Sequence, residues 1–367
     1  MKYLFILGRN IELSLAEIKA FFRKNDIEFK QLGLINNGLL IETKENLPKN
    51  IIDKLGGVVS MGEVLASGKA KEISNELDKR TIYLGENNKL NYIVFNFNGV
   101  DLEDISFYLK QKFKKESLKA TEKRLTGNIR LQEGVFVPNV ASRNIDEQYF
   151  LFENNFGRII EKSNYEKIEE RDMKKPVRRN ELSISPRLAK IMINLSEIKE
   201  NETLLDPFCG IGVILEEALI QGIKVIGIDK DRGAIENAKK NLKWFEFNSE
   251  NYKLMKDDSS KIKISKVEGI ATEPELGELQ KGMPTKEKAM EITRNFERLM
   301  VNVLKNLKSN IQGNIVFTAP LIFTGKERVS CNFKDMSLKA GLRIVLEPIN
   351  EFRSDSIIGR SIVVMKK

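Results

Sequence analysis

The most informative absence from this sequence of 367 residues is histidine, of which there is none. Without an imidazole, the chain cannot form a Ser-His-Asp triad, a Cys-His nucleophile pair or a histidine zinc site. Its two cysteines, Cys209 and Cys331, are too few for a disulfide framework or a CxxC zinc site. Any chemistry must therefore use carboxylates, amides, hydroxyls, backbone groups or an organic cofactor, and we expect no metal.

Long apolar runs are also absent, since no stretch approaches the roughly 20 residues that a membrane helix needs. The N-terminal string MKYLFILGRN lacks the small-residue cleavage site of a signal peptide. Hydrophobic residues make up 41% of the chain and charged residues 31%, which is typical of a globular protein with ample material for cores. Together with the few cysteines, this composition predicts a cytoplasmic protein that does not act at a membrane.

The net charge of +9 favours a polyanionic partner. Basic residues gather in two stretches, residues 109–130 and 171–180, and we predict that they contact phosphates of a nucleic acid. The simpler alternative for both stretches is an ordinary solvated lysine surface. The candidate phosphate contacts are Lys112, Lys114, Lys115, Lys119, Lys123, Arg124, Arg130, Lys174, Lys175, Arg178 and Arg179.

Regular alternation of strand and helix patterns begins at Ser183 and continues to the C-terminus. Alternation of this kind predicts an α/β fold with a doubly wound, mostly parallel sheet. The final two strands are too close in sequence for a crossover helix, so we expect them to pair antiparallel at one edge. The expected strands are residues 203–205, 224–228, 252–255, 269–272, 314–317, 342–347 and 361–365, and the expected helices are residues 186–195, 212–221, 232–245 and 286–307.

The part of the chain before residue 165 predicts smaller α/β segments without a catalytic constellation. A polar and charged connector, residues 165–180 with Pro176, follows these segments and marks the expected domain boundary. The expected strands are residues 3–7, 39–42, 91–97, 134–138 and 147–152 with a further one beginning near Val58, and the expected helices are residues 13–24, 49–55 and 101–113.

The clearest motif is the string Asp206-Pro-Phe208-Cys-Gly210-Ile-Gly212, which follows an apolar strand and precedes a helix. Glycines at a strand-to-helix turn allow the backbone to approach a ligand closely, with the helix N-terminus beneath it. Leu215 stands where a dinucleotide-binding fingerprint has its third small residue, which argues against NAD. The string instead resembles motif I of methyltransferases that modify amino groups, so we predict that Asp206, Phe208 and the two glycines bind S-adenosylmethionine.

Further acids follow the next two predicted strands. Asp229 ends the second strand, where a carboxylate can accept hydrogen bonds from both ribose hydroxyls. After the third strand, Asp258 is the preferred acceptor for the adenine amino group, with Asp257 as the close second. Upstream, Ser185 and Pro186 resemble motif X, with an N-cap serine and a proline at the first helical position. The free N–H groups of that helix end suit the methionine carboxylate, although an ordinary capped helix would have the same sequence.

The fourth predicted strand of this domain is followed by Glu273-Pro274-Glu275. Amino methyltransferases have Asp/Asn-Pro-Pro-Tyr/Phe at this place, in which a side-chain oxygen and a backbone carbonyl accept the N–H hydrogens of the amine. By this resemblance Glu273 is the acceptor, Pro274 follows it, and Glu275 stands where an aromatic ring would stack on the flipped base. We expect Phe208 or Phe323 to supply a ring instead.

Together these strings resemble the archaeal and eukaryal tRNA guanine-10 N2-methyltransferases and their bacterial relatives. The resemblance implies a ferredoxin-like segment over residues 1–60, a THUMP RNA-binding domain over 61–160, a linker over 161–182 and a Rossmann-like methyltransferase domain over 183–367. It also implies S-adenosylmethionine as cofactor, tRNA as partner, and methylation of the exocyclic N2 amine of a guanosine. The strings that carry it are Arg171–Pro176, Ser185–Leu195, Asp206–Gly212, Asn237–Trp244 and Gly359–Val363, with a looser match at Leu55–Gly57 and Gly62–Leu65.

Three alternatives stay open on the sequence alone. The chain could be a catalytically altered paralogue that binds the cofactor and RNA without transferring a methyl group. It could be an amino methyltransferase that acts on DNA or, less in keeping with its basic N-terminal half, on small molecules. The sequence also leaves open a dehydrogenase, against which Leu215 argues, and does not decide between a monomer and a homodimer.

Overall fold

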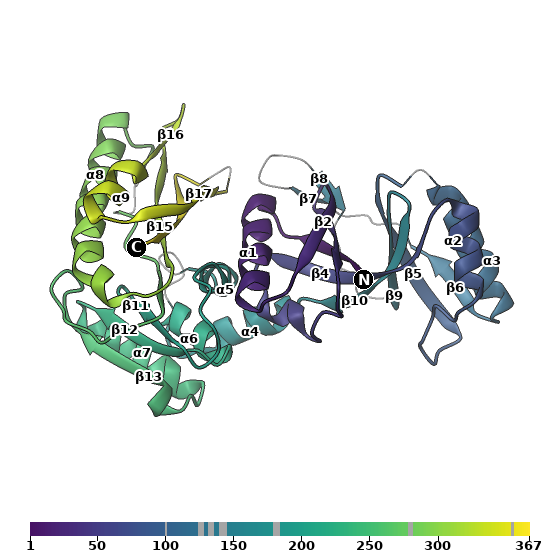
Figure 1. Ribbon diagram of the computed structural model, residues 1–367, viewed down its shortest axis with the longest axis horizontal. Coiled ribbons are helices and arrows are strands. Elements are labelled where there is room, and N and C mark those ends of the chain that lie inside the picture. Colours follow the sequence, from purple (N-terminus) through teal and green to yellow (C-terminus); the bar gives the residue numbers. More distant parts are fainter. Residues whose placement is uncertain are drawn as a thin grey trace. The chain divides into compact units, whose positions relative to one another are not determined.

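The contacts within the computed structural model divide the chain into two compact units (Figure 1). The first unit comprises Met1–Ile11, Ile27–Asp53 and Val58–Ser163, and the second unit comprises Glu12–Asp26, Lys54–Gly57 and Asn164–Lys367. The structure describes residues 1–99, 101–123, 128–130, 136–138, 145–178, 184–277, 282–353 and 356–367. No helix among these residues is both long enough and apolar enough to cross a membrane.

The first unit is built on an eight-stranded sheet with the strand order β2-β3-β1-β4-β10-β9-β5-β6. Strand β5 pairs parallel with β6 and β9, whereas the other pairs are antiparallel. Two helices, α2 and α3, contribute Ile73, Leu77, Ile105 and Leu109 to a core beside the sheet. The elements are β1 (Lys2–Leu7), β2 (Phe29–Ile35), β3 (Gly38–Thr43), β4 (Val58–Ser67), α2 (Ala70–Asp78), β5 (Lys89–Phe97), α3 (Leu102–Lys115), β6 (Lys119–Glu122), β7 (Asn128–Arg130), β8 (Phe136–Pro138), β9 (Glu147–Phe152) and β10 (Asn155–Lys162), with a 3-10 helix at Ile51–Lys54.

The sheet of the second unit confirms the predicted α/β fold class. Its strand order is β13-β12-β11-β14-β15-β18-β17, in which the pairs from β13 to β15 are parallel. The last two strands pair antiparallel at one edge, as their short connection predicts. The strands are β11 (Thr203–Asp206), β12 (Lys224–Asp229), β13 (Tyr252–Lys256), β14 (Gly269–Thr272), β15 (Ile315–Phe323), β16 (Arg328–Ser330), β17 (Arg343–Glu351) and β18 (Ile358–Lys366).

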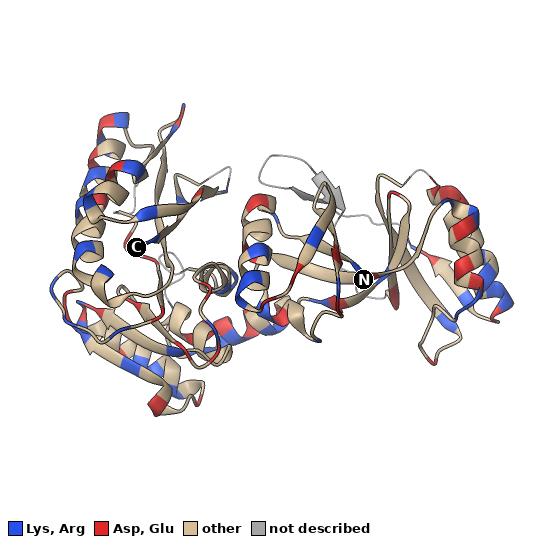
Figure 2. Cartoon of the chain, in the orientation of Figure 1, with Lys and Arg blue, Asp and Glu red and all other residues tan. Residues whose placement is uncertain are grey.

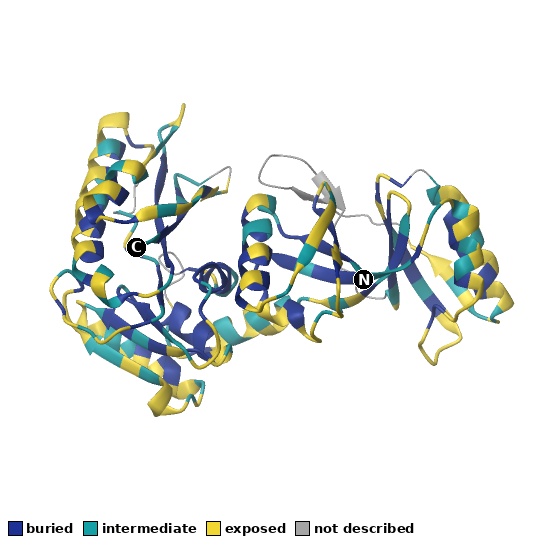
Figure 3. Ribbon diagram, viewed as in Figure 1, coloured by how far each residue is buried: buried dark blue, intermediate teal, exposed yellow. Residues whose placement is uncertain are grey.

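The central strands of this sheet are largely buried (Figure 3). Buried apolar residues form two clusters in this unit, of which one joins the sheet to α5, α6 and α7 and the other joins it to α8 and α9. This arrangement brings the carboxyl ends of β11, β12, β13 and β14 to the same edge. The helices are α4 (Tyr165–Lys174), α5 (Pro186–Leu195), α6 (Val213–Ile220), α7 (Arg232–Trp244), α8 (Lys286–Leu307) and α9 (Phe333–Ala340).

The contacts assign most of helix α1 (Ile11–Lys24) to the second unit, although the sequence analysis placed residues 1–60 in one segment. Glu17 is buried, and its carboxylate accepts hydrogen bonds from the amides of Gly56 and Gly57, each at 2.7 Å. Asn194 of α5 also donates to Glu17 at 2.7 Å and accepts from the Lys24 ammonium at 2.9 Å. Helix α5 is therefore buried on the side that faces α1 as well as on the side that faces the sheet.

The expected connector at residues 165–180 contains a helix, α4, that the polar composition did not predict. Its N-cap is Asn164, whose side chain accepts from the amide of Lys167 at 3.0 Å. None of its residues is buried, so the helix has no apolar stripe that a sequence pattern could reveal.

Candidate cofactor and active site

A glycine turn joins β11 to α6 and has the geometry that motif I predicts. Gly210 has φ of 52° and Gly212 has φ of 94°, a left-handed backbone that favours glycine. A Cβ at Gly210 would meet no atom within 4 Å, so this turn faces open space. Leu215 occupies the helix position where a dinucleotide fold has a small residue, and its Cδ1 would lie 2.6 Å from a Cβ at Gly227 of β12. Close helix–strand packing thus uses a glycine on the strand rather than on the helix.

Asp206, at the end of β11, supports this turn from inside the protein. Its carboxylate accepts from the hydroxyl of Thr272 at 2.5 Å and from the amide of Phe208 at 3.1 Å. Burial above all, together with the nearby carboxylates of Asp229 and Glu273, raises the pKa of Asp206 to about 7, against the lowering effect of the two hydrogen bonds. The structure therefore places three acids from three strands close enough to interact.

Asp229, at the end of β12, braces the other side of the glycine turn. One carboxylate oxygen accepts from the amide of Gly210 at 3.0 Å, and the other accepts from the amide of Asp231 at 2.9 Å. The side chain is half-buried, so it is also accessible to a ligand over the turn. Contact of this carboxylate with ribose hydroxyls stays a prediction.

The two acids after β13 are both exposed, and both already cap their own turn. Asp258 accepts from the amide of Ser260 at 2.9 Å and from its hydroxyl at 2.7 Å, and these bonds hold the pKa of Asp258 below its ordinary value. Asp257 accepts from the amide of Asp258 at 2.7 Å. The next residue, Ser259, is buried and donates to the carbonyl of Pro207 at 2.6 Å, which ties this loop to motif I.

Helix α5 begins as the sequence predicts, with Ser185 as its N-cap and Pro186 at the first helical position. The Ser185 hydroxyl accepts from the amide of Leu188 at 3.2 Å. That bond uses one of the free N–H groups of the helix end. A role for the others toward a carboxylate stays a prediction.

Glu273, directly after β14, is paired with an arginine that the sequence analysis did not single out. Arg360 of β18 donates through Nε to Glu273 Oε1 at 2.5 Å, and the hydroxyl of Thr318 lies 3.5 Å from the same oxygen. The Glu273 side chain is 9% exposed and that of Arg360 is 29% exposed. The predicted acceptor is therefore an oriented carboxylate, and one of its oxygens accepts from the positively charged guanidinium of Arg360.

The residues beside Glu273 differ in exposure. Pro274 is buried, whereas Glu275 is exposed at the place where related enzymes have a ring. Of the two proposed substitutes, Phe208 packs partly against the core of the sheet. Phe323 lies with its ring centroid 5.1 Å from the guanidinium of Arg328, which also contacts the ring of Phe352 at 4.1 Å. Phe323, at the end of β15, and Phe352, directly after β17, therefore both contact Arg328.

Comparison with known proteins decides the family. Residues 56–240, just over half of the chain, match the family model described as DNA methylase. The chain belongs to this family of methyltransferases. Residues 174–324 of the methyltransferase also match the model described as RMKL-like, methyltransferase domain. Both matches include the glycine turn and Asp229, and the second also includes Glu273.

Curated relatives and a solved structure resemble the methyltransferase. Over 96 residues it is 38% identical to the tRNA (guanine(10)-N2)-dimethyltransferase of Methanothermobacter thermautotrophicus, across 26% of this chain and 28% of that protein. Over 318 residues it is 26% identical to the tRNA (guanine(10)-N(2))-methyltransferase TRMT11 of Xenopus laevis, across 75% of this chain and 64% of that one. TrmN from Thermus thermophilus has a TM-score of 0.52 at 12% identity, with 100% of both chains covered, which shows a shared fold. The alignments span less than two thirds of both curated relatives.

The methyltransferase site suits S-adenosylmethionine in charge and in having open space above the glycine turn. The open space over Gly210 admits a ligand, and Asp206, Asp229 and Glu273 give the edge a negative charge that favours a cation. The cofactor carries a positive sulfonium and an ammonium group. The residues that would hold it are those of the glycine turn, Asp229 and the loop after β13.

The raised pKa of Asp206 predicts that affinity for this cofactor increases with pH. Below about pH 7 Asp206 carries a proton that must leave before the carboxylate can stabilise a cation. Affinity is therefore expected to rise from about pH 6 to about pH 7.5, at most about tenfold per pH unit. Isothermal titration calorimetry of S-adenosylmethionine measures this slope. S-adenosylhomocysteine, which lacks the sulfonium charge, should show a shallower slope, and an equal slope in Asp206→Asn would contradict the assignment.

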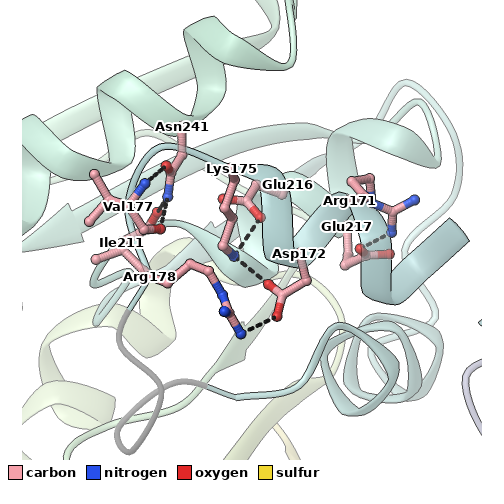
Figure 4. A network of polar contacts seen from close by, with 9 residues as sticks. All are labelled: Arg171, Asp172, Lys175, Val177, Arg178, Ile211, Glu216, Glu217 and Asn241. Atoms are coloured by element: carbon pink, nitrogen blue, oxygen red, sulfur yellow. Dashed lines mark hydrogen bonds and ion pairs between the residues drawn. The ribbon is translucent and has the colours of Figure 1, made fainter. Parts of the chain in front are cut away.

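The linker of the methyltransferase is pinned to its catalytic unit by buried polar contacts (Figure 4). Lys175, one of the proposed phosphate contacts, has a side chain that is 1% exposed and lies 2.8 Å from Asp172 and 3.1 Å from Glu216. A buried ammonium that is paired twice cannot reach a phosphate, so the prediction for Lys175 is wrong. Arg178 lies 3.8 Å from Asp172 and stays exposed, and the exposed Lys174 pairs with Glu170.

Asn241 of α7 links the same segment to the glycine turn (Figure 4). Its side-chain oxygen accepts from the amide of Val177 at 3.0 Å, and its amide group donates to the carbonyls of Val177 at 3.1 Å and Ile211 at 3.0 Å. Ile211 lies between the two glycines of motif I. The linker therefore lies in fixed register with the turn that would hold the cofactor.

The basic stretch of the first unit begins on helix α3 (Figure 2). The prediction for Lys112 is also wrong. Its side chain is 8% exposed, and its Nζ lies 3.1 Å from Glu116 Oε1, so it is not available to a phosphate. Arg124 and Arg179 lie outside the described residues, and the side chain of Arg130 does as well. The exposed members of the set in this stretch are Lys114, Lys115, Lys119 and Lys123.

Proposed function

We propose that this methyltransferase transfers a methyl group from S-adenosylmethionine to the exocyclic N2 amine of a guanosine in tRNA, at position 10. The observation that carries the proposal is the meeting of Asp229, the Gly210 turn and Glu273 at one edge of the methyltransferase sheet. The names of the two curated relatives support tRNA and guanine-10 as the target.

Methylation of an exocyclic amine needs acceptors for its N–H hydrogens, because the nitrogen lone pair is delocalised into the ring. By resemblance to the related motif, the Glu273 carboxylate accepts a hydrogen bond from one N–H and the Pro274 carbonyl accepts one from the other. As these bonds form, the nitrogen becomes pyramidal and its lone pair becomes available. The proton that the nitrogen loses on methylation passes to the Glu273 carboxylate. The cofactor, when bound, supplies a methyl group on a sulfonium leaving group, so the chain needs no metal for this step.

A carboxylate at this position suits guanine in particular. The Watson–Crick edge of guanine presents two adjacent donors, N1–H and the N2 amine, whereas adenine presents its amine beside an acceptor nitrogen. A negatively charged carboxylate accepts from both donors of guanine but repels the acceptor of adenine. Arg360 pairs with Glu273 and so orients this acceptor.

The first unit would bind the tRNA as the THUMP-containing part of the protein. Its exposed lysines, Lys114, Lys115, Lys119 and Lys123, suit phosphate contacts that fix the position of the tRNA without reading its sequence. Each such contact contributes affinity that falls as salt increases. Exposed Lys174 and Arg178 of the second unit are further candidates for phosphate contacts.

Incubation with labelled S-adenosylmethionine and total unmodified tRNA, followed by nucleoside mass spectrometry, tests the proposal. The expected product is N2-methylguanosine or N2,N2-dimethylguanosine, and digestion of a single tRNA transcript should place it at position 10. Methylated adenosine in tRNA, or product on duplex DNA alone, would contradict it and favour a DNA amino methyltransferase.

A second candidate is a paralogue that binds cofactor and RNA without transferring a methyl group. The exposed Glu275 favours it, because a ring at this place would contribute about 1–3 kcal/mol of base stacking. In that case calorimetry would detect cofactor binding and filter assays would detect tRNA binding, while no methylated nucleoside would form under any condition.

A further inference from the structure

Arg360 is the one cation that contacts the proposed acceptor Glu273 within the described part of the chain. The strand order β14-β15-β18 explains how residues so distant in sequence meet. Glu273 directly follows β14, Thr318 lies on β15, and Arg360 lies on β18 opposite Pro320 of β15. Three neighbouring strands thus place a carboxylate, a hydroxyl and a guanidinium in one row at the edge that also holds the glycine turn.

Both described contacts to Glu273 use the same oxygen. Arg360 Nε lies 2.5 Å from Oε1, and Thr318 Oγ1 lies 3.5 Å from it, so neither contact uses Oε2. A glutamate has one more rotatable bond than the aspartate or asparagine of the related motif. A charge-assisted bond to one oxygen removes that freedom and fixes the direction of the other oxygen.

The charges around this pair are mixed. Asp206 of β11 interacts with Glu273, and Glu351 of β17 lies opposite Arg360 across the β17–β18 pairing. Without the guanidinium, Glu273 would face the negative charge of Asp206 and the hydroxyl of Thr318 with no cation in contact. No charge-assisted bond would then hold Oε1, and Oε2 could turn away from the amine.

We propose that Arg360 is a positioning residue that fixes Oε1 of Glu273 and thereby presents its Oε2 to the amine of the substrate. This inference rests on the proposed function, since it assigns the device that makes a glutamate competent in place of the shorter acid. Arg360 itself does not contact the reacting atoms. Its effect should appear in the rate of methyl transfer rather than in the binding of cofactor or tRNA.

Arg360→Gln and Arg360→Lys, compared with the full wild-type chain, test the proposal. Arg360→Gln should lower kcat by at least tenfold near pH 7.5, with the KM for tRNA and the Kd for S-adenosylmethionine within about twofold of wild type. Arg360→Lys should restore most of the rate, because it returns a cation that can donate to Oε1 of Glu273. Arg343→Gln, a change at an exposed arginine of β17, is the matched control and should behave as wild type.

The outcomes separate the two proposals. If the wild-type chain methylates tRNA guanosine and Arg360→Gln keeps its kcat, the role of Arg360 is refuted and the proposed function stands. A loss of rate that follows a fall in Tm and that Arg360→Lys does not restore also refutes it and leaves a structural ion pair. If the wild-type chain methylates no tRNA, the proposed function fails and the assignment of Arg360 fails with it.

Discussion

Replacing Glu273 by alanine is expected to lower kcat for tRNA methylation by about 10²–10⁴-fold, the range for loss of a positioned proton acceptor. The variant loses the carboxylate that accepts from the amine and leaves the Arg360 guanidinium beside the substrate. A cation at this place repels a nitrogen that becomes positive as the methyl group arrives. Single-turnover kinetics with saturating cofactor measures the effect on the chemical step.

The affinity of Glu273→Ala for S-adenosylmethionine should stay near that of wild type, because the contacts of the glycine turn use Asp229 and Asp206. The kcat of Glu273→Gln should fall between those of Glu273→Ala and the wild type, since glutamine keeps one acceptor oxygen but adds a donor. Glu347→Ala, at an exposed glutamate of β17, is the matched control. Full activity of Glu273→Ala would move the acceptor to another residue.

The parts of the site that the sequence predicts are those whose geometry is local. Gly210 and Gly212 adopt positive φ because a strand-to-helix turn requires it, and Asp229 follows them at the end of the adjacent parallel strand. Ser185 caps its helix through a bond three residues ahead. Each of these features depends on a few neighbouring residues or on the order of two strands, so a motif in one sequence is enough to indicate it.

The parts that the sequence does not predict depend on tertiary pairing. Arg360 lies 87 positions from Glu273, and only the strand order brings the two together. Lys112 and Lys175 look like surface lysines in the sequence, but each has a buried or partly buried acid within reach. The competing signal for Lys175 is the pair of acids at Glu216 and Glu217, which stand on an otherwise apolar helix.

Helix α1 shows the same limit at the level of domains. Its amphipathic pattern predicts a helix correctly, but the pattern cannot say which sheet or helix covers the apolar face. A clue does exist, because Glu17 and Lys24 lie among apolar residues of α1, and Lys190 and Asn194 lie among apolar residues of α5. Polar side chains on two otherwise buried helices indicate that they pair with each other.

This pairing gives the largest expected effect on stability. Glu17→Ala removes the carboxylate that accepts from Gly56, Gly57 and Asn194 and leaves these buried donors without it. Each buried donor left unpaired costs about 1–3 kcal/mol, so we expect a loss of about 4 kcal/mol in the free energy of unfolding. For a unit of this size that corresponds to a fall in Tm of roughly 10 °C, which differential scanning calorimetry measures.

No side chain added at Gly56 can replace the lost contacts of Glu17, because the backbone at Gly56 approaches α5 closely. A Cβ on Gly56 would lie 2.1 Å from the carbonyl oxygen of Arg187, whose own side chain donates to the Gly56 carbonyl at 2.9 Å. Glu12→Ala, at the exposed first turn of α1, is the control and should change Tm by no more than about 1 °C. An unchanged Tm in Glu17→Ala would show that α1 does not stabilise the methyltransferase unit. If Tm falls as expected, removal of residues 1–160 also removes part of the catalytic unit, so the RNA role of the first unit must be tested with lysine substitutions in the full chain.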